Sequence, residues 1–316
     1  MVLQRTIKNI VSSVGVGLHS GQKVALTLNP APEGHGVVFE RLDIKNNARI
    51  KVNALAVKET KLCSTIGNEN FSIATVEHLM SALSATGIDN ILIQLDGKEI
   101  PIMDGSSISF IHLIKSAIIV EQKKAKEFVV IKDVVEIIDG DKYARFEPYD
   151  GFVVDFTIDF PHPAFKEEES QVSIDFFKDS YIEEISRART FGFMQEVEYL
   201  RSNGLARGGS LENAIVLDDY KILNEDGLRY KDEFVRHKIL DAIGDLYLLG
   251  NPIIGKFTAH KSGHDLNNRL LRLLIEKKDA WEVQTINASE HTSHSSLSSY
   301  LHVNEELKKI AQKNIL

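Results

Sequence analysis

Apolar and polar residues alternate with a period of two along 23–30 (KVALTLNP) and 36–43 (GVVFERLD). This pattern is typical of strands that bury one face. Along 71–90 the apolar residues recur instead at helical spacing, with Thr75 as a candidate helix cap and Gly87 as a natural stop. The remaining elements expected in this part of the chain are a strand over 90–97 and a helix over 106–122.

The second part of the chain repeats this order of strands and helices. The segment 127–160 is rich in Val, Ile and Phe with Gly and Asp turns, which predicts an antiparallel meander. The segment 232–250 predicts a strongly amphipathic helix, followed by a strand-like segment, 253–264, and a helical one, 266–281. Between the two parts, the charged segment 123–127 (KKAKE) is expected to be a linker.

These elements predict an α+β fold of two domains with similar plans. The predicted N-terminal domain covers 1–125, the C-terminal domain covers 126–288, and a variable tail occupies 289–316. The tail is rich in Ser and His, a composition that is compatible with metal binding but more typical of a solvated terminus. We therefore place no functional site in the tail.

The composition narrows the classes of function. A net charge of −8 argues against a general nucleic-acid binder, which needs a basic surface. Cys63 is the only cysteine, so neither an intrachain disulfide nor a multi-cysteine zinc cluster can form, and we assign this residue to packing. No stretch approaches the ~18–20 apolar residues of a membrane span. We expect a cytoplasmic protein without stable membrane insertion.

The segment FVRHKILDAIGD carries a candidate metal site. His237 and Asp241 are four residues apart, so a helix places both side chains on one face, where they can reach the same small cation. Asp245 lies one turn further along and suits a carboxylate that orients a histidine. Two ligands do not complete a catalytic zinc site, and most such pairs are ordinary polar residues on an exposed helix face.

Other segments offer further candidates, each with a simpler reading. In TVEHL, Glu77 and His78 at a helix start can supply a base and a metal ligand, but a Glu favoured by the helix dipole next to a partly buried His is the simpler explanation of this segment alone. In KSGHDLNN, His264 can project from a loop just before a helix and act as a general acid beside Asp245, or it can be a surface histidine. In SRARTFGFM, Thr190 offers a hydroxyl that by itself says little.

Several motifs occur together in a characteristic order. They are GVGLHSG, TVEHLMSAL, IDNILIQLDGKEIPIMDGSS, FTIDFPHPA, ISRARTFGFM, DEFVRHKILDAIGDLYLLG and KSGHDLNN. From about residue 3 to about residue 285 the chain closely resembles the UDP-3-O-acyl-N-acetylglucosamine deacetylases of lipid A synthesis in Gram-negative bacteria. The resemblance implies two similar domains, each a mainly antiparallel sheet with two helices, with the helices sandwiched between the sheets.

The resemblance also implies the catalytic set. The implied metal ligands fall on His78, His237 and Asp241. The metal is expected to be zinc, and ferrous iron suits the same donors in the cell. The implied general base falls on Glu77. The implied general acid falls on His264, and its carboxylate partner on Asp245. The implied oxyanion donor falls on Thr190, and the nearby cation on Lys238.

The implied substrate contacts fall on a second group of residues. Lys142, Phe160 and Lys261 match positions for the UDP moiety, although Phe160 can equally be a core residue of a strand. Phe191 begins an insert, 191–218, that the resemblance makes a passage for the acyl chain. Its apolar runs can also be ordinary core elements. His19, in GVGLHSG, is expected near the site without an assigned role.

The resulting hypothesis is an amide hydrolase. It converts UDP-3-O-acyl-N-acetylglucosamine to UDP-3-O-acyl-glucosamine and acetate, with Glu77 as base and His264 as acid, and the resemblance favours a monomer. Two alternatives stay open: a deacetylase of another N-acetylated sugar nucleotide, and a non-catalytic nucleotide-sugar binder. The apolar insert argues against the first, and the presence of base, acid and three ligands together argues against the second.

Overall fold

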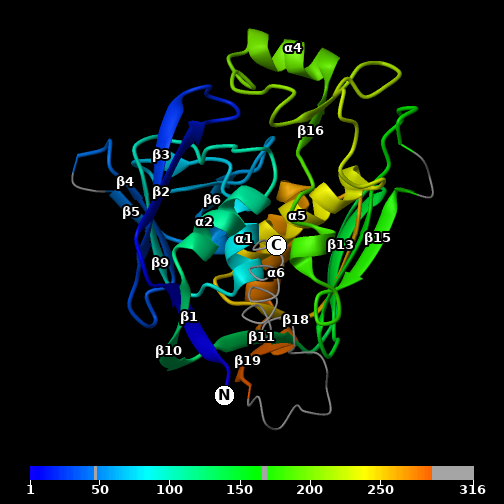
Figure 1. The fold of residues 1–316 in the computed structure, drawn as a ribbon. Coiled ribbons are helices and arrows are strands. Elements are labelled where there is room, and N and C mark those ends of the chain that lie inside the picture. The colour runs from blue at the N-terminus through cyan, green and yellow to red at the C-terminus, as the bar shows by residue number, and fades with distance from the viewer. Residues whose placement is uncertain (46–47, 166–168, 287–316) are drawn as a thin grey trace, which may run out of the picture.

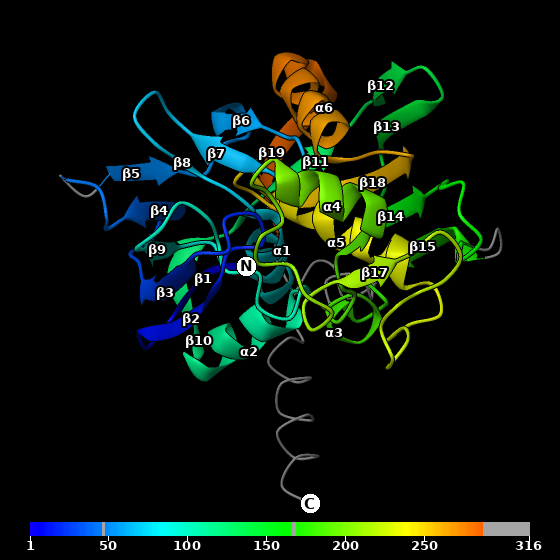
Figure 2. The same cartoon turned by 90° about the horizontal axis from the view of Figure 1, so that it is seen from above.

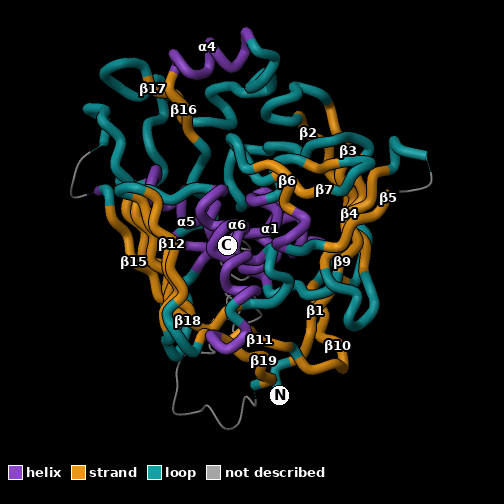
Figure 3. Tube along the Cα trace, turned by 180° about the vertical axis from the view of Figure 1, so that it is seen from behind, coloured by secondary structure: helices purple, strands orange, loops and turns teal. Residues whose placement is uncertain are grey.

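The computed structural model describes residues 1–45, 48–165 and 169–286. The predicted tail, 289–316, lies outside the described residues. The longer helices lie between two groups of strands, one formed by the first part of the chain and one by the second (Figures 1 and 3). The strand pairs are mainly antiparallel, so the predicted α+β class with helices sandwiched between sheets is confirmed.

The first sheet has five strands and includes the strands expected over 23–30, 36–43 and 90–97. Its order is β2-β3-β9-β4-β5, and every pair is antiparallel except β4 with β9. Alternation in β3 places Val24, Leu26 and Leu28 in the core. The bounds of the strands are Val11–Val16 (β2), Lys23–Pro30 (β3), Val37–Arg41 (β4), Ala48–Lys51 (β5) and Ile91–Leu95 (β9).

A small three-stranded sheet and a two-stranded one accompany it. The first leads into the candidate site, and the second pairs the two ends of the first part of the chain. The three-stranded sheet contains β6 (Val57–Glu59), β7 (Thr65–Gly67) and β8 (Ser72–Ile73). The two-stranded sheet contains β1 (Leu3–Ile7) and β10 (Ile119–Ala125).

The prediction that residues 123–127 form a linker is wrong. Strand β10 continues to Ala125 because it pairs with β1, and β11 begins at Glu127. Between them, Lys126 is buried, with its Nζ donating to the carbonyl of Gly87 at 2.9 Å and 3.0 Å from the carboxylate of Asp89. The charged composition therefore reflects a buried ion pair and a strand rather than an open connection.

The first part of the chain contributes helices α1 (Glu77–Thr86) and α2 (Ile108–Ser116), where the sequence predicts them. The stop at Gly87 is confirmed, since its φ of 67° ends α1 in the left-handed conformation that glycine tolerates. The prediction that Thr75 caps this helix is wrong. Val76 precedes the helix without a side-chain cap, and the Thr75 hydroxyl donates instead to Glu99 at 3.3 Å.

The second sheet follows the order β12-β13-β18-β11-β19, with β14 also paired to β18 and β15 to β14. Only β12 and β13 form the expected hairpin. Strand β18 lies between β13 and β14, antiparallel to β13 and parallel to β14. The prediction of an antiparallel meander over 127–160 is therefore wrong. The bounds are Glu127–Ile131 (β11), Val135–Asp139 (β12), Lys142–Glu147 (β13), Phe152–Thr157 (β14), Gln171–Asp175 (β15), Ile253–His260 (β18) and Trp281–Thr285 (β19).

Helix α5 (Glu233–Tyr247) lies at the centre of the molecule, and α6 (His264–Glu276) packs beside it. The helix over 232–250 is confirmed, but its expected amphipathic character is wrong. Only Arg236 and Lys238 of α5 are not buried, because α1, α6 and the second sheet surround it. Gly244 allows α1 to approach closely, since a Cβ there would overlap the carbonyl oxygen of Glu77.

Short elements of the insert lie above this helical layer. Figure 2, seen from above, shows α4 over α5. These elements are β16 (Phe191–Phe193), α4 (Met194–Ser202) and β17 (Ile215–Leu217), and the short helix α3 (Tyr181–Glu184) precedes the insert. Throughout the described ranges, no helix has both the length and the apolar character that crossing a membrane requires.

Candidate active site

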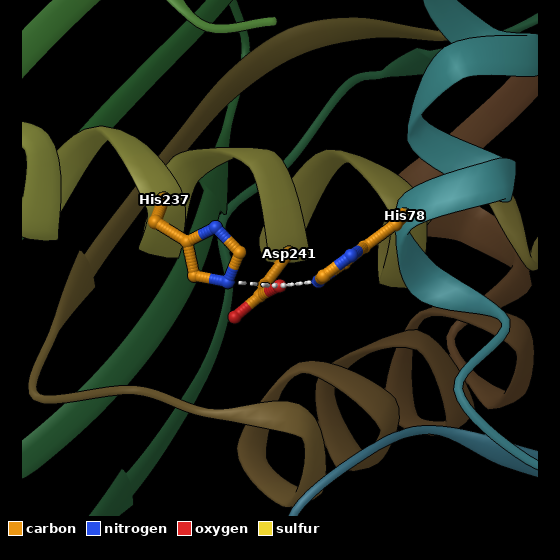
Figure 4. A group of neighbouring side chains, drawn as sticks. All are labelled: His78, His237 and Asp241. Atoms are coloured by element: carbon orange, nitrogen blue, oxygen red, sulfur yellow. Dashed lines mark ion pairs between the residues drawn. The ribbon is translucent and has the colours of Figure 1, made fainter. Parts of the chain in front are cut away.

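Three buried side chains from α1 and α5 converge on one point. His78 belongs to the first turn of α1, and His237 and Asp241 lie one turn apart on α5 (Figure 4). Oδ1 of Asp241 lies 3.5 Å from Nε2 of His78 and 3.3 Å from Nε2 of His237. The three ligand atoms lie within 4.8 Å of one another, and the two rings meet edge to face.

The protonation of these groups fits a cation between them. Nδ1 of His237 lies 3.0 Å from the carbonyl of Ala188, so this nitrogen carries the proton of the neutral ring and Nε2 is left with its lone pair. Burial lowers the pKa of His237 to about 4, which keeps the ring neutral at pH 7. Within the described residues, Oδ1 of Asp241 is buried without a hydrogen-bond partner.

The carboxylate of Asp241 is ionised in this environment. Burial opposes its ionisation, but His237 and Lys238 hold the pKa of this carboxyl well below its usual range. Lys238 Nζ donates to Oδ2 at 2.8 Å, so Oδ1 is left facing two imidazole nitrogens. A cation bound by all three atoms would supply the partner that Oδ1 of Asp241 lacks within the described residues. The residues therefore fit a divalent metal.

Glu77 lies beside this group at the start of α1. The side chain is buried, and its Oε2 accepts a hydrogen bond from the backbone N–H of Ser64 at 3.1 Å. Burial raises the pKa of Glu77 to about 7, against the opposing charge of His264. A carboxylate whose pKa is close to neutral can accept a proton and release it again.

His264 has the opposite character. It is the first residue of α6 rather than a residue of the preceding loop. Although burial favours the neutral ring, the carboxylate of Asp245, 2.9 Å from Nδ1, raises the pKa of His264 to about 9. Nε2 of the same ring lies 3.9 Å from Oε1 of Glu77. A carboxyl group whose pKa is close to 7 and an imidazolium thus face one another, which is the arrangement expected of a base and an acid.

A cavity of about 330 Å³ adjoins the site and is walled largely by the insert. Thr190 and Phe191 line it, and His19 lines it from the first part of the chain. Phe191 also contacts the His237 ring, with 6.2 Å between ring centroids. The other lining residues from α4 and β17 are mainly apolar and include Val197, Leu200 and Val216.

The implied UDP contacts lie in different surroundings. Phe160 is half-buried in an aromatic cluster, 5.7 Å from Phe191, at the edge of the site. Lys261 forms ion pairs of 2.7 Å with both Asp141 and Asp159. Lys142 is exposed at the start of β13. A diphosphate would have to compete with two carboxylates for Lys261.

Two residues that the sequence did not single out form hydrogen bonds with Asp245, the partner of His264. Asn267 donates to Oδ2 of Asp245 at 2.9 Å, and it could have been found because it follows His264 by three residues on the same helix face. Ser64 donates its hydroxyl to Oδ1 of Asp245 at 2.5 Å. No local pattern marks Ser64, since its partners are far away in the sequence. Cys63 is buried beside it, and burial raises the pKa of its thiol to about 12.

Comparisons with known proteins agree with the geometry. The family model for UDP-3-O-acyl N-acetylglycosamine deacetylase matches residues 4–276. Proteins named UDP-3-O-acyl-N-acetylglucosamine deacetylase are similar over nearly their whole length. That of Hahella chejuensis is 58% identical over 285 residues (90% of this chain, 94% of the relative). Those of Cellvibrio japonicus and Thioalkalivibrio sulfidiphilus are 55% and 54% identical, covering 89% and 95% of this chain and 93% and 98% of their own. The resemblance seen in the sequence is confirmed, and the chain belongs to the UDP-3-O-acyl N-acetylglycosamine deacetylase family.

Proposed function

We propose that the protein hydrolyses the acetamide of UDP-3-O-acyl-N-acetylglucosamine to UDP-3-O-acyl-glucosamine and acetate, as a step of lipid A biosynthesis. The observation that carries the proposal is one buried group of His78, His237 and Asp241 next to an opposed base and acid, Glu77 and His264. The names of the relatives support the choice of substrate.

His78, His237 and Asp241 would hold the metal, which we propose to be zinc, with ferrous iron as the alternative that the same donors accept. When bound, such an ion lowers the pKa of a water molecule and polarises an amide oxygen. The hydrogen bond from Nδ1 of His237 to Ala188 fixes the ring with Nε2 toward the site. Lys238 anchors the other oxygen of Asp241.

Glu77 acts as the general base. Its carboxylate takes a proton from the water that attacks the acetamide carbon, a role that its raised pKa permits. His264 acts as the general acid. Its imidazolium, held by Asp245, donates the proton from Nε2 to the departing nitrogen, so that the C–N bond breaks and a neutral amine leaves. The hydroxyl of Thr190 donates to the negative charge that develops on the acetamide oxygen.

The cavity of the insert would hold the acyl chain. Its apolar wall and its position next to Thr190 and Phe191 support this assignment. We assign the UDP moiety to the side of Phe160, Lys142 and Lys261, where the aromatic cluster reaches Phe191. The cytoplasmic location, the monomeric state and the domain limits stay predictions.

The test combines metal analysis with a measurement of acetate release. Purified protein should contain about one divalent ion per chain and release acetate from the acylated substrate, and a chelator should abolish the activity until metal is returned. Unacylated UDP-N-acetylglucosamine is the control. Equal turnover of both sugars would favour a deacetylase of another sugar nucleotide, and binding without acetate release would favour a nucleotide-sugar binder.

A further inference from the structure

Ser64 connects the two proposed proton-transfer groups. This residue is 1% exposed and precedes β7. Its N–H donates to Oε2 of Glu77, and its carbonyl accepts from the N–H of Val76 at 3.2 Å, next to Glu77 in the chain. Its hydroxyl donates to Oδ1 of Asp245 on α5. Every polar group of this buried serine is therefore bound within the candidate site.

The contacts of Asp245 explain why this hydroxyl matters. Oδ2 of Asp245 accepts from Asn267 and lies 2.9 Å from Nδ1 of His264, both on α6. Oδ1 accepts from Ser64, which belongs to the first part of the chain. The carboxylate is thus held from both sides, and its rotation about the Cβ–Cγ bond is fixed. Removing the hydroxyl would leave Oδ1 buried without this donor and free the carboxylate to turn.

We propose that Ser64 is a positioning residue for catalysis: its hydroxyl fixes the orientation of Asp245, and thereby the direction in which His264 presents Nε2. The backbone N–H of the same residue fixes Glu77, so one residue sets the separation of the base and the acid. Partners that orient a catalytic histidine in this way commonly change activity ~10–100-fold when they are removed. The inference rests on the proposed deacetylase function.

The experiment compares Ser64→Ala with Ser64→Thr in the metal-loaded, full-length protein. Ser64→Ala keeps the backbone contacts to Glu77 and removes only the hydroxyl. We expect kcat for acetate release to fall ~10–100-fold, while KM and metal content stay within about twofold of the wild type. Ser64→Thr retains a hydroxyl but adds a methyl group to a buried position, so we expect it to lower the melting temperature and to retain most of kcat.

The matched control is Ser81→Ala. Ser81 is buried to the same degree, but its hydroxyl contacts Tyr181 at 2.6 Å, and neither residue belongs to the proposed machinery. This variant should lose stability and keep kcat. The inference is overturned if Ser64→Ala keeps its kcat, or if kcat in all three variants follows the melting temperature rather than the hydroxyl. A wild-type protein that releases no acetate would instead refute the proposed function, which keeps the two failures apart.

Discussion

Nδ1 of His264 lies 2.9 Å from Oδ2 of Asp245, across the contact between α6 and α5. The carboxylate stabilises the imidazolium, and the hydrogen bond leaves the proton on Nε2 directed to the side of the ring where Glu77 lies. In the proposed mechanism, Nδ1 of His264 would orient the ring and Nε2 would donate the proton.

Replacing His264 with Ala should separate catalysis from metal binding. The ring is not among the three converging ligands, so metal content should stay near that of the wild type. The rate should fall ~10²–10⁴-fold because the leaving nitrogen loses its proton donor. Acetate release and metal stoichiometry on the same preparation test this. Turnover at the normal rate would rule out His264 as the acid.

Replacing Asp241 with Ala should weaken metal binding. The change removes one of the three proposed ligands and leaves His78 and His237 in place. Competition with a chromogenic chelator should show at least ~10-fold lower affinity. Asp265→Ala is a suitable control, because this acid is exposed on α6 and pairs with Arg269. Equal metal affinity in the Asp241 variant and the control would contradict the assignment.

The rate should show a bell-shaped dependence on pH. Glu77 must be ionised, so the rate falls as the pH drops through its pKa, which lies at about 7 before metal binds and lower with a cation alongside. His264 must be protonated, so the rate falls as the pH rises through about 9. Asp245→Asn removes the neighbouring charge and should move the basic limb of kcat/KM to lower pH. A basic limb that does not move in this variant would contradict the role of Asp245.

Filling the cavity should discriminate against the acyl chain. Ala214 lines the cavity, and Ala214→Phe would displace about two methylene groups of a bound chain. At about 0.8 kcal/mol per methylene, kcat/KM for the acylated substrate should fall ~10-fold. The reaction of the unacylated sugar nucleotide provides the internal control and should not change. An equal loss with both substrates would place the acyl chain elsewhere.

Gly244→Ala should disturb the site through the backbone. The added Cβ overlaps the carbonyl oxygen of Glu77, so α1 must move away from α5. Overpacking of this kind costs about 1–3 kcal/mol, which thermal unfolding would show as a lower melting temperature. Metal affinity should fall as well, since His78 follows Glu77 on the displaced helix. An unchanged melting temperature and an unchanged metal affinity would show that the close contact between Gly244 and Glu77 does not fix the position of α1.

The sequence predicted those features that depend on local spacing. The interval between His237 and Asp241 requires a shared helix face, and the alternation in β3 requires one buried face, whatever lies nearby. Features that depend on distant partners were not predictable in the same way. Strand β18 follows β13 and β14 by about a hundred residues in the chain but pairs between them in the sheet. Lys126 is buried because it forms an ion pair with Asp89, which is distant in the sequence. Only the family resemblance predicted that His78 lies beside α5, because no local sequence pattern connects the two.

The close approach of α1 and α5 at Gly244 has a consequence for the metal-free protein. Because His78 belongs to α1 and the other two candidate ligands belong to α5, an ion bound by them would act as a removable cross-link between segments that are distant in the chain, and its loss would loosen their junction as well as lower the stability of the folded state. Amide hydrogens in the first turn of α1 should then exchange with solvent faster, while those of the central strands keep their protection. Chelation would thus be detected both as faster exchange at one end of α1 and as a lower melting temperature of the whole molecule.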